Sequence, residues 1–587
     1  MKQIQTSFRT IEALDETVRK IRQWSRNVLG SVVLIQIYTE ILDRQYITDV
    51  VSRIKKSLPD AVICGCSSNG NIMNGDFAGD SFVLVSSFFE YPSTKVEALS
   101  FDYNDMSQKE ITESLRKAVA ERPWVTGVQM LSKIRGMSMT KLCEGLSELP
   151  EDLQIFGGAA FAADLDNDES CVFTGDKYLE NGIVFVLYGG EDLHINTRFL
   201  TGWKPLGSYL HVTKAEGSVL KELNGQPAYD IYYKYLHIKN DEHFFFNTLE
   251  FPFLYRSNDI DIMRAPTASN QDGSLTMTSD IEEGVLARIA YGDPWTILET
   301  THEAGRDLLT FAPEAITVYS CAARRTFWGN KEVGKETEVY QMIAPTSGFY
   351  TAGEFLRTGR IVNQHNVTQV IVAMREGKAR SLPEELIHTE NKEFEGKVSM
   401  INRMATFITA TTRELEEANR RLQEMAVRDA LTGVWNKTAY FARINKINAG
   451  EQKDFAVAVF DMNGLKGIND TFGHECGDTA LQHVANNLRA VFGEDNLYRI
   501  GGDEFITVID RADSAAMTEL FARLDRELEK FNEQEHIYKS PLSISKGYSV
   551  YDSAEDREYI DTFRKADNAM YRDKAEYYKL HDRRRRN

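Results

Sequence analysis

The sequence predicts a multidomain α/β protein, with a mixed α/β N-terminal region, a connecting helix and a smaller C-terminal α/β domain. Three observations lead to this prediction. The chain has 587 residues, more than one hydrophobic core usually organises. Short apolar runs alternate with helical patterns up to about residue 376, and again from about residue 428. Between these regions lies a long helical pattern that contains no proline after Pro383.

The N-terminal region reads as mixed α/β. Strand-like runs such as "VVLIQIY" and "IVFVLYGG" are separated by helical patterns such as "SQKEITESLRKAVAE". A strand entering a small-residue turn ("ICGCSSNG", then "IFGGAAFAAD") is followed each time by a second apolar strand, which indicates two related halves. From Trp203 the pattern changes to two short strands, an "NG" turn and a helix. We therefore expect a helical lead over residues 1–30 and domains over 31–200 and 201–380.

The connecting segment, residues 385–427, has an apolar seam with heptad spacing. The seam consists of Ile401, Ile408, Leu415 and Leu422 at one position and Met404, Thr411, Ala418 and Met425 at the other. Sustained spacing of this kind between charged flanks predicts a parallel coiled coil and a homodimer joined through residues 401–425. The alternative is a single amphipathic helix packed on its own domain.

The C-terminal domain, residues 428–579, alternates strands and helices in an order that predicts a mainly antiparallel sheet. The unbroken apolar run "FAVAVF" indicates a buried strand, and Asp461 follows it at once. In "RIGGDEF", Gly501 and Gly502 would form a hairpin tip that lets backbone approach a ligand, with Asp503 projecting from it. Two such carboxylates suit a divalent cation bound together with substrate phosphates. On its own, however, this stretch is more typical of an ordinary tight turn, because glycine and aspartate are what any tight turn prefers.

The segment after the buried strand, "DMNGLKGINDTFGHECGD", favours the functional interpretation of that hairpin. It is expected to be a loop in which amides beside Gly464 and Leu465 face phosphates, with Lys466 as a nearby cation.

Charge and composition exclude several classes of protein. The formal net charge of −19 argues against a general nucleic-acid or anionic-membrane binder. The N-terminus lacks the apolar core of a signal peptide, and no apolar run is long enough to span a bilayer. Six scattered cysteines fit a reducing compartment, so we expect a cytoplasmic protein. The basic tail, residues 580–587, is expected to be solvated.

The C-terminal residues resemble the GGDEF-domain diguanylate cyclases, a family of nucleotidyltransferases. The resemblance rests on "DALTGVWNK", "DMNGLKGINDTFGHECGD", "RIGGDEF" and "KADNAMYRDK", which occur in this order. It implies a ferredoxin-like, palm-type α+β domain that joins two GTP molecules into cyclic di-GMP and releases two pyrophosphates. Each domain of a dimer would hold one GTP and two Mg²⁺ (or Mn²⁺) ions.

Residue by residue, the resemblance assigns the metals to Asp461, Asp503 and the carbonyl of Met462. Glu504 would assist metal binding or activation of the 3′-hydroxyl. The remaining assignments concern the nucleotide: Asn469 and Asp478 would read guanine, and Lys574 would contact phosphates.

The chain departs from the family pattern at two places. The product-inhibition site normally contains an arginine where this chain has Phe492, although Asp495 is present. Feedback inhibition through that site is therefore expected to be absent. The usual glycine and arginine after the lysine of the last helix are also missing, and Lys579 or the arginines from Arg583 are the candidate substitutes.

Residues from about Val32 to Gly377 resemble FIST sensory domains with their FIST C-terminal part. The resemblance rests on stretches such as "GCSSNG", "FGGAAFAAD", "RAPTASNQDGSL", "SCAARRTFWG" and "GFYTAGEF". It implies a small-molecule ligand. Candidate ligand contacts are polar residues in apolar, glycine-rich neighbourhoods, namely Arg264, Cys321, Arg324, Arg325 and Glu354. Each is more often a salt-bridge or backbone-bonding group in proteins.

Together these features predict a cytoplasmic, ligand-regulated diguanylate cyclase. One alternative is a catalytically silent module that binds GTP or a partner. Another is a plain dimerisation protein, which leaves the combination of Asp461, Asn469, Asp478 and Asp503 unexplained.

Overall fold

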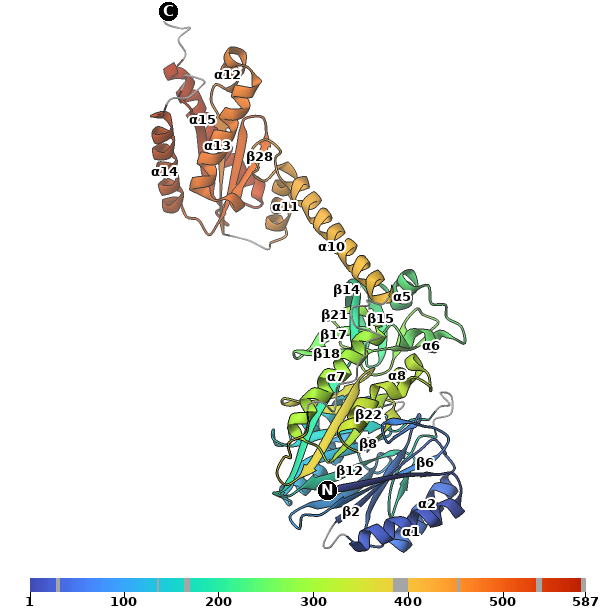
Figure 1. Cartoon of the computed structure of the whole chain (residues 1–587). Coiled ribbons are helices and arrows are strands. Elements are labelled where there is room, and N and C mark those ends of the chain that lie inside the picture. The colour runs from blue at the N-terminus through green and yellow to red at the C-terminus, as the bar shows by residue number, and fades with distance from the viewer. Residues whose placement is uncertain are drawn as a thin grey trace, which may run out of the picture. The chain divides into compact units, whose positions relative to one another are not determined.

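The structure, a computed structural model, describes residues 1–27, 32–134, 137–162, 169–383, 400–450, 454–534 and 541–581. The chain forms two compact units, Met1–Thr412 and Arg413–Asn587, and each is described by itself. The first is coloured from blue to yellow in Figure 1 and the second from orange to red. No helix in the described ranges is long and apolar enough to cross a membrane.

Three repeats of one pattern build the N-terminal unit. Each supplies a leading strand, a helix, two parallel strands with helix between them, a short hairpin and a closing strand. The first repeat is β1 (Lys2–Phe8), α1 (Ile11–Asn27), β2 (Val32–Thr39), α2 (Arg44–Ser57), β3 (Val62–Ser67), β4 (Asn71–Met73), β5 (Asp76–Ala78) and β6 (Phe82–Phe89). The second is β7 (Lys95–Asp102), α3 (Gln108–Ala120), β8 (Val125–Ser132), α4 (Thr140–Ser147), β9 (Gln154–Ala159), β10 (Val172–Thr174), β11 (Tyr178–Leu179) and β12 (Gly182–Gly189).

The third repeat is split by an insertion after its leading strand. It consists of β13 (Leu193–Leu200), then α7 (Pro294–Phe311), β22 (Ala315–Cys321), α8 (Ala322–Trp328), the short helix Val333–Glu336, α9 (Glu338–Ile343), β23 (Thr346–Thr351), β24 (Glu354–Thr358), β25 (Ile361–His365) and β26 (Gln369–Glu376). The insertion is a separate sheet with two helices: β14 (Trp203–Glu216), β15 (Val219–Leu223), β16 (Gln226–Pro227), α5 (Ala228–Leu236), α6 (Phe244–Leu249), β17 (Phe253–Ser257), β18 (Ile260–Arg264), β19 (Pro266–Ser269), β20 (Leu275–Met277) and β21 (Leu286–Gly292).

The repeats exchange their hairpins in a cycle. The first hairpin pairs with β23 of the third repeat, the second with β3 of the first, and the third with β9 of the second. The three six-stranded sheets consequently share one order: leading strand, closing strand, the two parallel strands, then the borrowed hairpin. No repeat can complete its sheet alone, so the three form one cooperative unit.

A glycine marks the equivalent position in each sheet: Gly65, Gly157 and Gly348. Each pairs with a residue of the neighbouring parallel strand. A Cβ added there would lie 2.2, 1.9 or 1.8 Å from that partner's carbonyl oxygen. Because a side chain cannot fit so close to backbone, this row fixes which residues of the three repeats correspond.

The inner faces of the three sheets meet in a common core that contains Tyr38, Phe156, Tyr319 and Phe349. The outer faces are covered by helices: α1 and α2 on the first sheet, α3 and α4 on the second, α7 and α9 on the third. Figure 1 shows α1 and α2 lying together beside β2 and β6. The core is therefore buried between sheets, and each sheet is closed to solvent by its own helices.

Two expectations for this region are wrong, and a third is incomplete. The predicted helical lead begins with β1, which is an edge strand of the first sheet. The predicted boundary near residue 200 does not separate compact units, because β13 pairs with β26 and β9 pairs with β24. The two related halves are two of three repeats. The predicted strands, "NG" turn and helix after Trp203 are confirmed, with Asn224 and Gly225 both at positive φ.

The helix predicted over residues 401–425 is confirmed as α10, Met400–Val427. Along its seam Leu415 and Leu422 are each 62% exposed and Met425 is 74% exposed. The side chain of Ile401 and residues 385–399 lie outside the described residues. Pairing of this helix with a second chain stays a prediction.

The C-terminal unit contains a four-stranded antiparallel sheet in the order β28-β29-β27-β30. Its elements are α11 (Lys437–Asn448), β27 (Phe455–Met462), α12 (Leu465–Phe472), α13 (His474–Phe492), β28 (Leu497–Gly501), β29 (Glu504–Asp510), α14 (Ser514–Asn532), β30 (Ile544–Val550) and α15 (Tyr559–His581). Helices α13 and α14 cover one face, and α11 and α15 cover the other. The mainly antiparallel α+β prediction is confirmed. The segment predicted as a loop is instead the helical pair α12 and α13, and the tail residues 582–587 lie outside the described residues.

Candidate functional site

The site is built around Asp461 near the end of β27, a strand whose eight residues are all buried. Side chains alternate between the two faces of a strand. Val457 and Val459 pack in the core beneath α15, so Asp461 points to the α15 face at the end of that row. Glu504 is paired directly opposite Asp461 in β29, and the two carboxylates therefore share one face of the sheet.

The hairpin between β28 and β29 brings Asp503 to the same end. Its pairing is irregular between Arg499 and Gly501, and Gly502 has a φ of +49°. The carbonyl of Asp503 accepts a hydrogen bond from the amide of Met462 at 3.1 Å. This bond fixes the tip of the hairpin against the end of β27.

Arg499 ties the hairpin to the start of the domain. Its Nη2 and Nε donate to the carbonyl of Gly502 at 2.7 and 3.1 Å, and its Nη1 donates to Asp429 at 2.9 Å. Asp429 also accepts from the amide and hydroxyl of Thr432. These bonds lower the pKa of Asp429 against the opposing effect of burial. The residues that directly follow α10 are thus hydrogen-bonded to the tip of the hairpin.

Lys574 reaches the carboxylates from α15. Its Nζ lies 2.7 Å from Oδ1 of Asp461. The helix lies very close to β30: a Cβ at Gly547 would stand 2.2 Å from the amide nitrogen of Met570. Gly547 therefore allows the close approach that places Lys574 over the sheet end.

The electrostatics of this site favour an added cation. Burial raises the pKa of Asp461, and the charge of Asp503 raises it further, against the effect of Lys574. Burial also raises the pKa of Glu504, with added contributions from Asp461 and Asp503. Burial lowers the pKa of Lys574, but the two aspartates outweigh this effect and the net shift is upward. A carboxylate cluster with one lysine is incompletely neutralised.

The residues present fit a divalent cation that also needs ligands from a substrate. Asp461 Oδ1 is buried and, apart from its ion pair, has no hydrogen-bond donor of acceptable geometry within the described residues. No group of three or more His, Cys, Asp or Glu side chains in the described ranges is arranged to hold a metal. Mg²⁺ commonly binds one or two carboxylates and completes its shell with phosphates and water.

The predicted guanine-reading residues lie on neighbouring helices. Asn469 is on α12 and Asp478 on α13, and the two helices are separated by Gly473 at a φ of +87°. A Cβ at Gly477 would stand 1.9 Å from Oδ1 of Asn469. The amide of Asn469 therefore rests on α13 beside Asp478, which is exposed.

The predicted phosphate contacts are placed at the start of α12. Gly464 precedes this helix with a φ of +74°, and Leu465 and Lys466 are its first two residues. The first amides of a helix have no intrahelical partner and suit an anion. Gly501 and Gly502 are exposed at the hairpin tip.

Phe492 is a core residue at the end of α13. It is 4% exposed and packs against Phe460 and Phe521, with ring centroids 5.1 and 6.2 Å away. Asp495 follows in a short helical turn. A ring buried in this way is not available to a ligand on the surface, and the absence of feedback inhibition stays a prediction.

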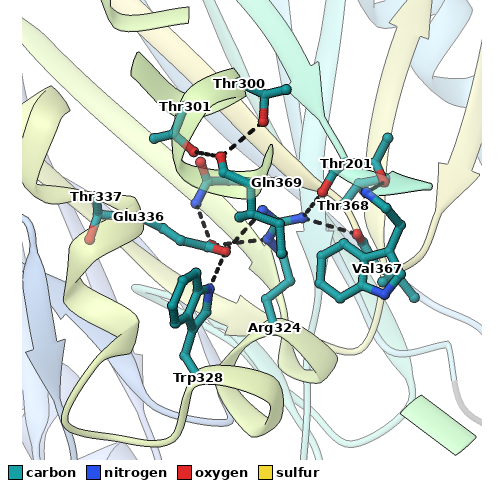
Figure 2. Close-up of polar contacts among 12 residues, drawn as sticks. Thr201, Thr300, Thr301, Arg324, Trp328, Glu336, Thr337, Val367, Thr368 and Gln369 are labelled. Carbon is teal, nitrogen blue, oxygen red and sulfur yellow. Dashed lines mark hydrogen bonds and ion pairs between the residues drawn. The ribbon is translucent and has the colours of Figure 1, made fainter. Parts of the chain in front are cut away.

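In the N-terminal unit, the structure places Arg324 in a closed polar cluster (Figure 2). Its Nε and Nη2 donate to the two carboxylate oxygens of Glu336 at 2.9 and 3.0 Å. Its Nη1 donates to the carbonyls of Thr201 and Val367 at 2.6 and 3.2 Å. Trp328 donates to the same carboxylate. All three guanidinium nitrogens are thus engaged by protein acceptors.

The other candidate sensor residues also have protein partners. Arg264 donates to the carbonyl of Asp280 at 2.8 Å, and Arg325 to Glu40 at 2.9 Å. Cys321 is buried at the start of α8, and burial raises the pKa of its thiol. Glu354 accepts from Thr351 and Thr368, both at 2.6 Å, and burial raises its pKa to about 8. None of these five residues lines the cavity that is bounded by β13, α7 and β24.

Four residues that position the site are not apparent as such from the sequence: Asp429, Gly477, Arg499 and Gly547. Arg499 stands two residues before the glycine pair, and Asp429 lies in the entry motif, but their mutual contact depends on the fold. Gly477 and Gly547 act through what a side chain would strike, which no sequence pattern reveals.

Three family models match the chain. They are the FIST N domain over residues 33–226, the FIST C domain over 228–357, and "Diguanylate cyclase, GGDEF domain" over 426–579. The two FIST matches precede the GGDEF match along the chain. These matches confirm the resemblances to both families and their order along the chain.

Curated relatives share parts of the chain. The bifunctional diguanylate cyclase/cyclic di-GMP phosphodiesterase MucR of Pseudomonas aeruginosa is 32% identical over 171 residues, 28% of this chain and 24% of that protein. Diguanylate cyclase DgcN of Escherichia coli K12 is 28% identical over 236 residues, 38% and 55% of the two chains. An uncharacterized protein of Methanocaldococcus jannaschii is 23% identical over 432 residues, which are 65% of this chain and 81% of that protein. This chain spans about a quarter of MucR and about half of DgcN.

Among solved structures, the coiled coil and GGDEF domain of DgcB from Caulobacter crescentus, in complex with c-di-GMP, is 21% identical. The match covers 30% of this chain and 95% of that chain, with a TM-score of 0.28.

Proposed function

We propose that this FIST–GGDEF protein is a diguanylate cyclase that condenses two GTP molecules into cyclic di-GMP and two pyrophosphates. One observation carries the proposal. The hairpin and β27 present Asp461 and Asp503 at one end of the sheet, in the same domain as the Asn469 and Asp478 pair. A metal-phosphate site and a purine-reading site together suit a nucleoside triphosphate.

The residues of this chain would divide the chemistry among them. Asp461, Asp503 and the carbonyl of Met462 would hold Mg²⁺ or Mn²⁺, which supplies neutralisation of phosphate charge when bound. Lys574 would exchange its contact with Asp461 for a phosphate. Glu504, whose pKa is raised, is suited to assist loss of the 3′-hydroxyl proton. Attack of that oxygen on an α-phosphorus releases pyrophosphate without a covalent enzyme intermediate.

Specificity for guanine would come from Asp478. A carboxylate accepts hydrogen bonds from the N1–H and exocyclic amino groups of guanine, a donor pair that adenine lacks. Asn469 provides both a donor and an acceptor beside it.

Regulation would run from the FIST region through α10. A ligand at the FIST region changes the register or spacing of two α10 helices in a homodimer, and each domain delivers its GTP to the other. The Asp429–Arg499–Gly502 contacts connect the end of α10 with the hairpin. We place the protein in the cytoplasm, which agrees with six cysteines that are all unpaired.

The catalytic proposal is tested by incubating the full chain with Mg²⁺ and GTP and separating the nucleotides. Cyclic di-GMP is expected from the wild type and not from Asp503→Ala. GTP binding without turnover in both proteins would instead identify a silent nucleotide-binding module. Turnover that survives in Asp503→Ala would place the chemistry elsewhere.

The dimer proposal is tested with Leu415→Asp, which puts a charge on the exposed apolar seam of α10. Monomers and loss of cyclic di-GMP formation are expected together, because one domain holds only one GTP. Ala410→Asp, on an exposed position away from the seam, is the matched control and should remain dimeric and active. Sedimentation and activity are measured on the same samples. An active Leu415→Asp monomer would refute the requirement for a dimer.

A further inference from the structure

The N-terminal unit contains a cavity of about 680 Å³ between its second and third repeats. Its walls are β13 and α7 of the third repeat, the hairpin strand β24, and the start of β9. This volume lies within the range of small-molecule sites. Phe199, Leu200 and Leu356 give it an apolar side, and two arginines, Arg198 and Arg357, line it as well.

The repeats provide an internal comparison for Arg198. Residues that pair directly across neighbouring strands form a row across a sheet. In the third sheet, Arg198 on the leading strand lies in the same row as Gly348. The rows through the corresponding glycines of the other sheets begin with Thr6 and Leu99. The leading strand therefore forms with an uncharged residue at this position in two repeats of three.

Arg357 also stands where the other two repeats have an uncharged residue. It lies two residues after Phe355, which pairs with Gly157, the glycine at the equivalent position of the second sheet. The corresponding positions in the other hairpins are Asn74 and Gly175. Both arginines are thus additions of the third repeat, and both residues line the same cavity.

Several hydrogen-bond donors of the residues that line the cavity have no acceptor within the described residues. The Nη groups of Arg357 donate to carbonyls at the end of α4 and beyond, including Leu146 and Leu153. Its Nε, the Nε of Arg198 and the hydroxyl of Thr358 have no hydrogen-bond partner among the described residues. Arg357 is 7% exposed, so its Nε has no compensation from bulk water. A buried polar atom without a hydrogen-bond partner destabilises the fold, so three such atoms among the residues that line one cavity need an explanation.

We propose that this cavity binds a small organic carboxylate. The unpaired donors of Arg198 and Thr358 would turn to its oxygens, and the apolar wall would hold its carbon skeleton. A planar carboxylate matches the geometry of a guanidinium group. A doubly charged phosphate is disfavoured relative to a singly charged carboxylate, because three acidic residues, Glu151, Glu303 and Asp307, line the same cavity.

The site gives the proposed sensor a location and a ligand class, and in that respect it rests on the proposed function. Asp307 pairs with Arg198 at 2.8 Å and links α7 to β13. A carboxylate on Arg198 would compete with this link between two elements of the third repeat.

The test is calorimetric titration of the full chain, without nucleotide, using three pairs of probes. The pairs are acetate and acetamide, benzoate and benzamide, and succinate and succinamide. At least one carboxylate is expected to bind saturably below about 10 mM, at least tenfold more tightly than its amide. Thr358→Val should weaken that binding about fivefold and Arg198→Gln at least tenfold.

Arg53→Gln is the matched control, because Arg53 is a half-exposed arginine paired with Asp15 on a surface helix. It should bind as the wild type does. Thermal unfolding without probe shows whether each variant is folded. Three results would overturn the proposal: no carboxylate binds, amides bind equally well, or binding persists unchanged in folded Arg198→Gln. Because no nucleotide is present, such a failure leaves the cyclase proposal standing, and a failed cyclase assay leaves this titration valid.

Discussion

Two ion pairs, one in each unit, show how differently this protein uses buried charge. Arg324 and Glu336 are 0% and 1% exposed, and the guanidinium makes four hydrogen bonds to protein oxygens. Lys574 and Asp461 are 27% and 6% exposed, and Asp461 Oδ1 has no hydrogen-bond donor in addition to the ion pair. The first pair is complete as it stands, whereas the second leaves capacity for another ligand.

The difference separates a structural from a functional charge. A satisfied buried pair resists removal of either partner, because the remaining charge would be stranded. A pair with an unsatisfied oxygen, a repelling neighbour and partial solvent access can exchange its partner for a metal or phosphate at little cost.

Asp461→Asn should reduce cyclic di-GMP formation at least about 1000-fold, or about 4 kcal/mol in activation free energy, because the amide cannot neutralise a cation. Stability should stay the same or increase. The pKa of Asp461 is raised in the fold, so ionisation costs stability as the pH rises through that value, and Asn remains neutral. Asp525→Asn, an exposed aspartate of the same domain, is the control for turnover and urea unfolding. If Asp461→Asn kept a turnover within tenfold of the wild type, Asp461 would not be a metal ligand of the reaction.

Glu336→Gln should destabilise the N-terminal unit by about 3–5 kcal/mol, because Arg324 would remain buried with its charge uncompensated. Urea unfolding of the full chain measures the loss. Glu332→Gln is a close control. Glu332 lies four residues before Glu336 in the chain, is half-exposed and pairs with Lys335. It should change stability by less than about 0.5 kcal/mol. Equal effects of the two substitutions would show that the buried pair is not the structural anchor inferred here.

Gly477→Ala should weaken GTP binding about tenfold, roughly 1.4 kcal/mol, because the new methyl group displaces Asn469 from α13. Gly467→Ala is the control: it lies in α12 with open space around it and should bind GTP as the wild type does. Binding of a non-hydrolysable GTP analogue is compared by calorimetry. Unchanged affinity in Gly477→Ala would remove Asn469 from the nucleotide site.

The stability of the N-terminal unit should depend on pH through the ionisation of Glu354. Its pKa is raised from 4.5 to about 8 by burial, so its contribution to stability is present below pH 4.5 and is lost as the pH rises through about 8. Thermal unfolding from pH 5 to 9 should show this decline. Glu354→Gln, which imitates the protonated acid, should flatten the profile and be more stable than the wild type at pH 9. A parallel decline in both proteins would assign the effect to other groups.

The sequence predicts the C-terminal domain well because its signals are local. The apolar run before Asp461 specifies a buried strand, and the glycine pair of "RIGGDEF" specifies the hairpin. The same locality caused the error at α12. Gly464 and Gly473 read as loop residues, but each stands at positive φ directly before a helix, where glycine is also favoured.

The N-terminal unit could be predicted only in part, because its organisation is non-local. Its strands are recognisable as apolar runs, but each hairpin completes the sheet of another repeat. The insertion between β13 and α7 also separates the leading strand of the third repeat from its remainder. For the same reason, no local pattern distinguishes Arg324, which is enclosed, from Arg357, which lines a cavity.

The central claim is that Asp461 is held by Lys574 in a form ready to accept a cation with the nucleotide. The most direct test counts Mn²⁺ ions bound to the full chain by electron paramagnetic resonance, in the presence of a non-hydrolysable GTP analogue. About two ions per nucleotide site are expected in the wild type, and fewer in Asp461→Asn under the same conditions. Equal Mn²⁺ binding by the two proteins, or none beyond that of the free nucleotide, would contradict the account.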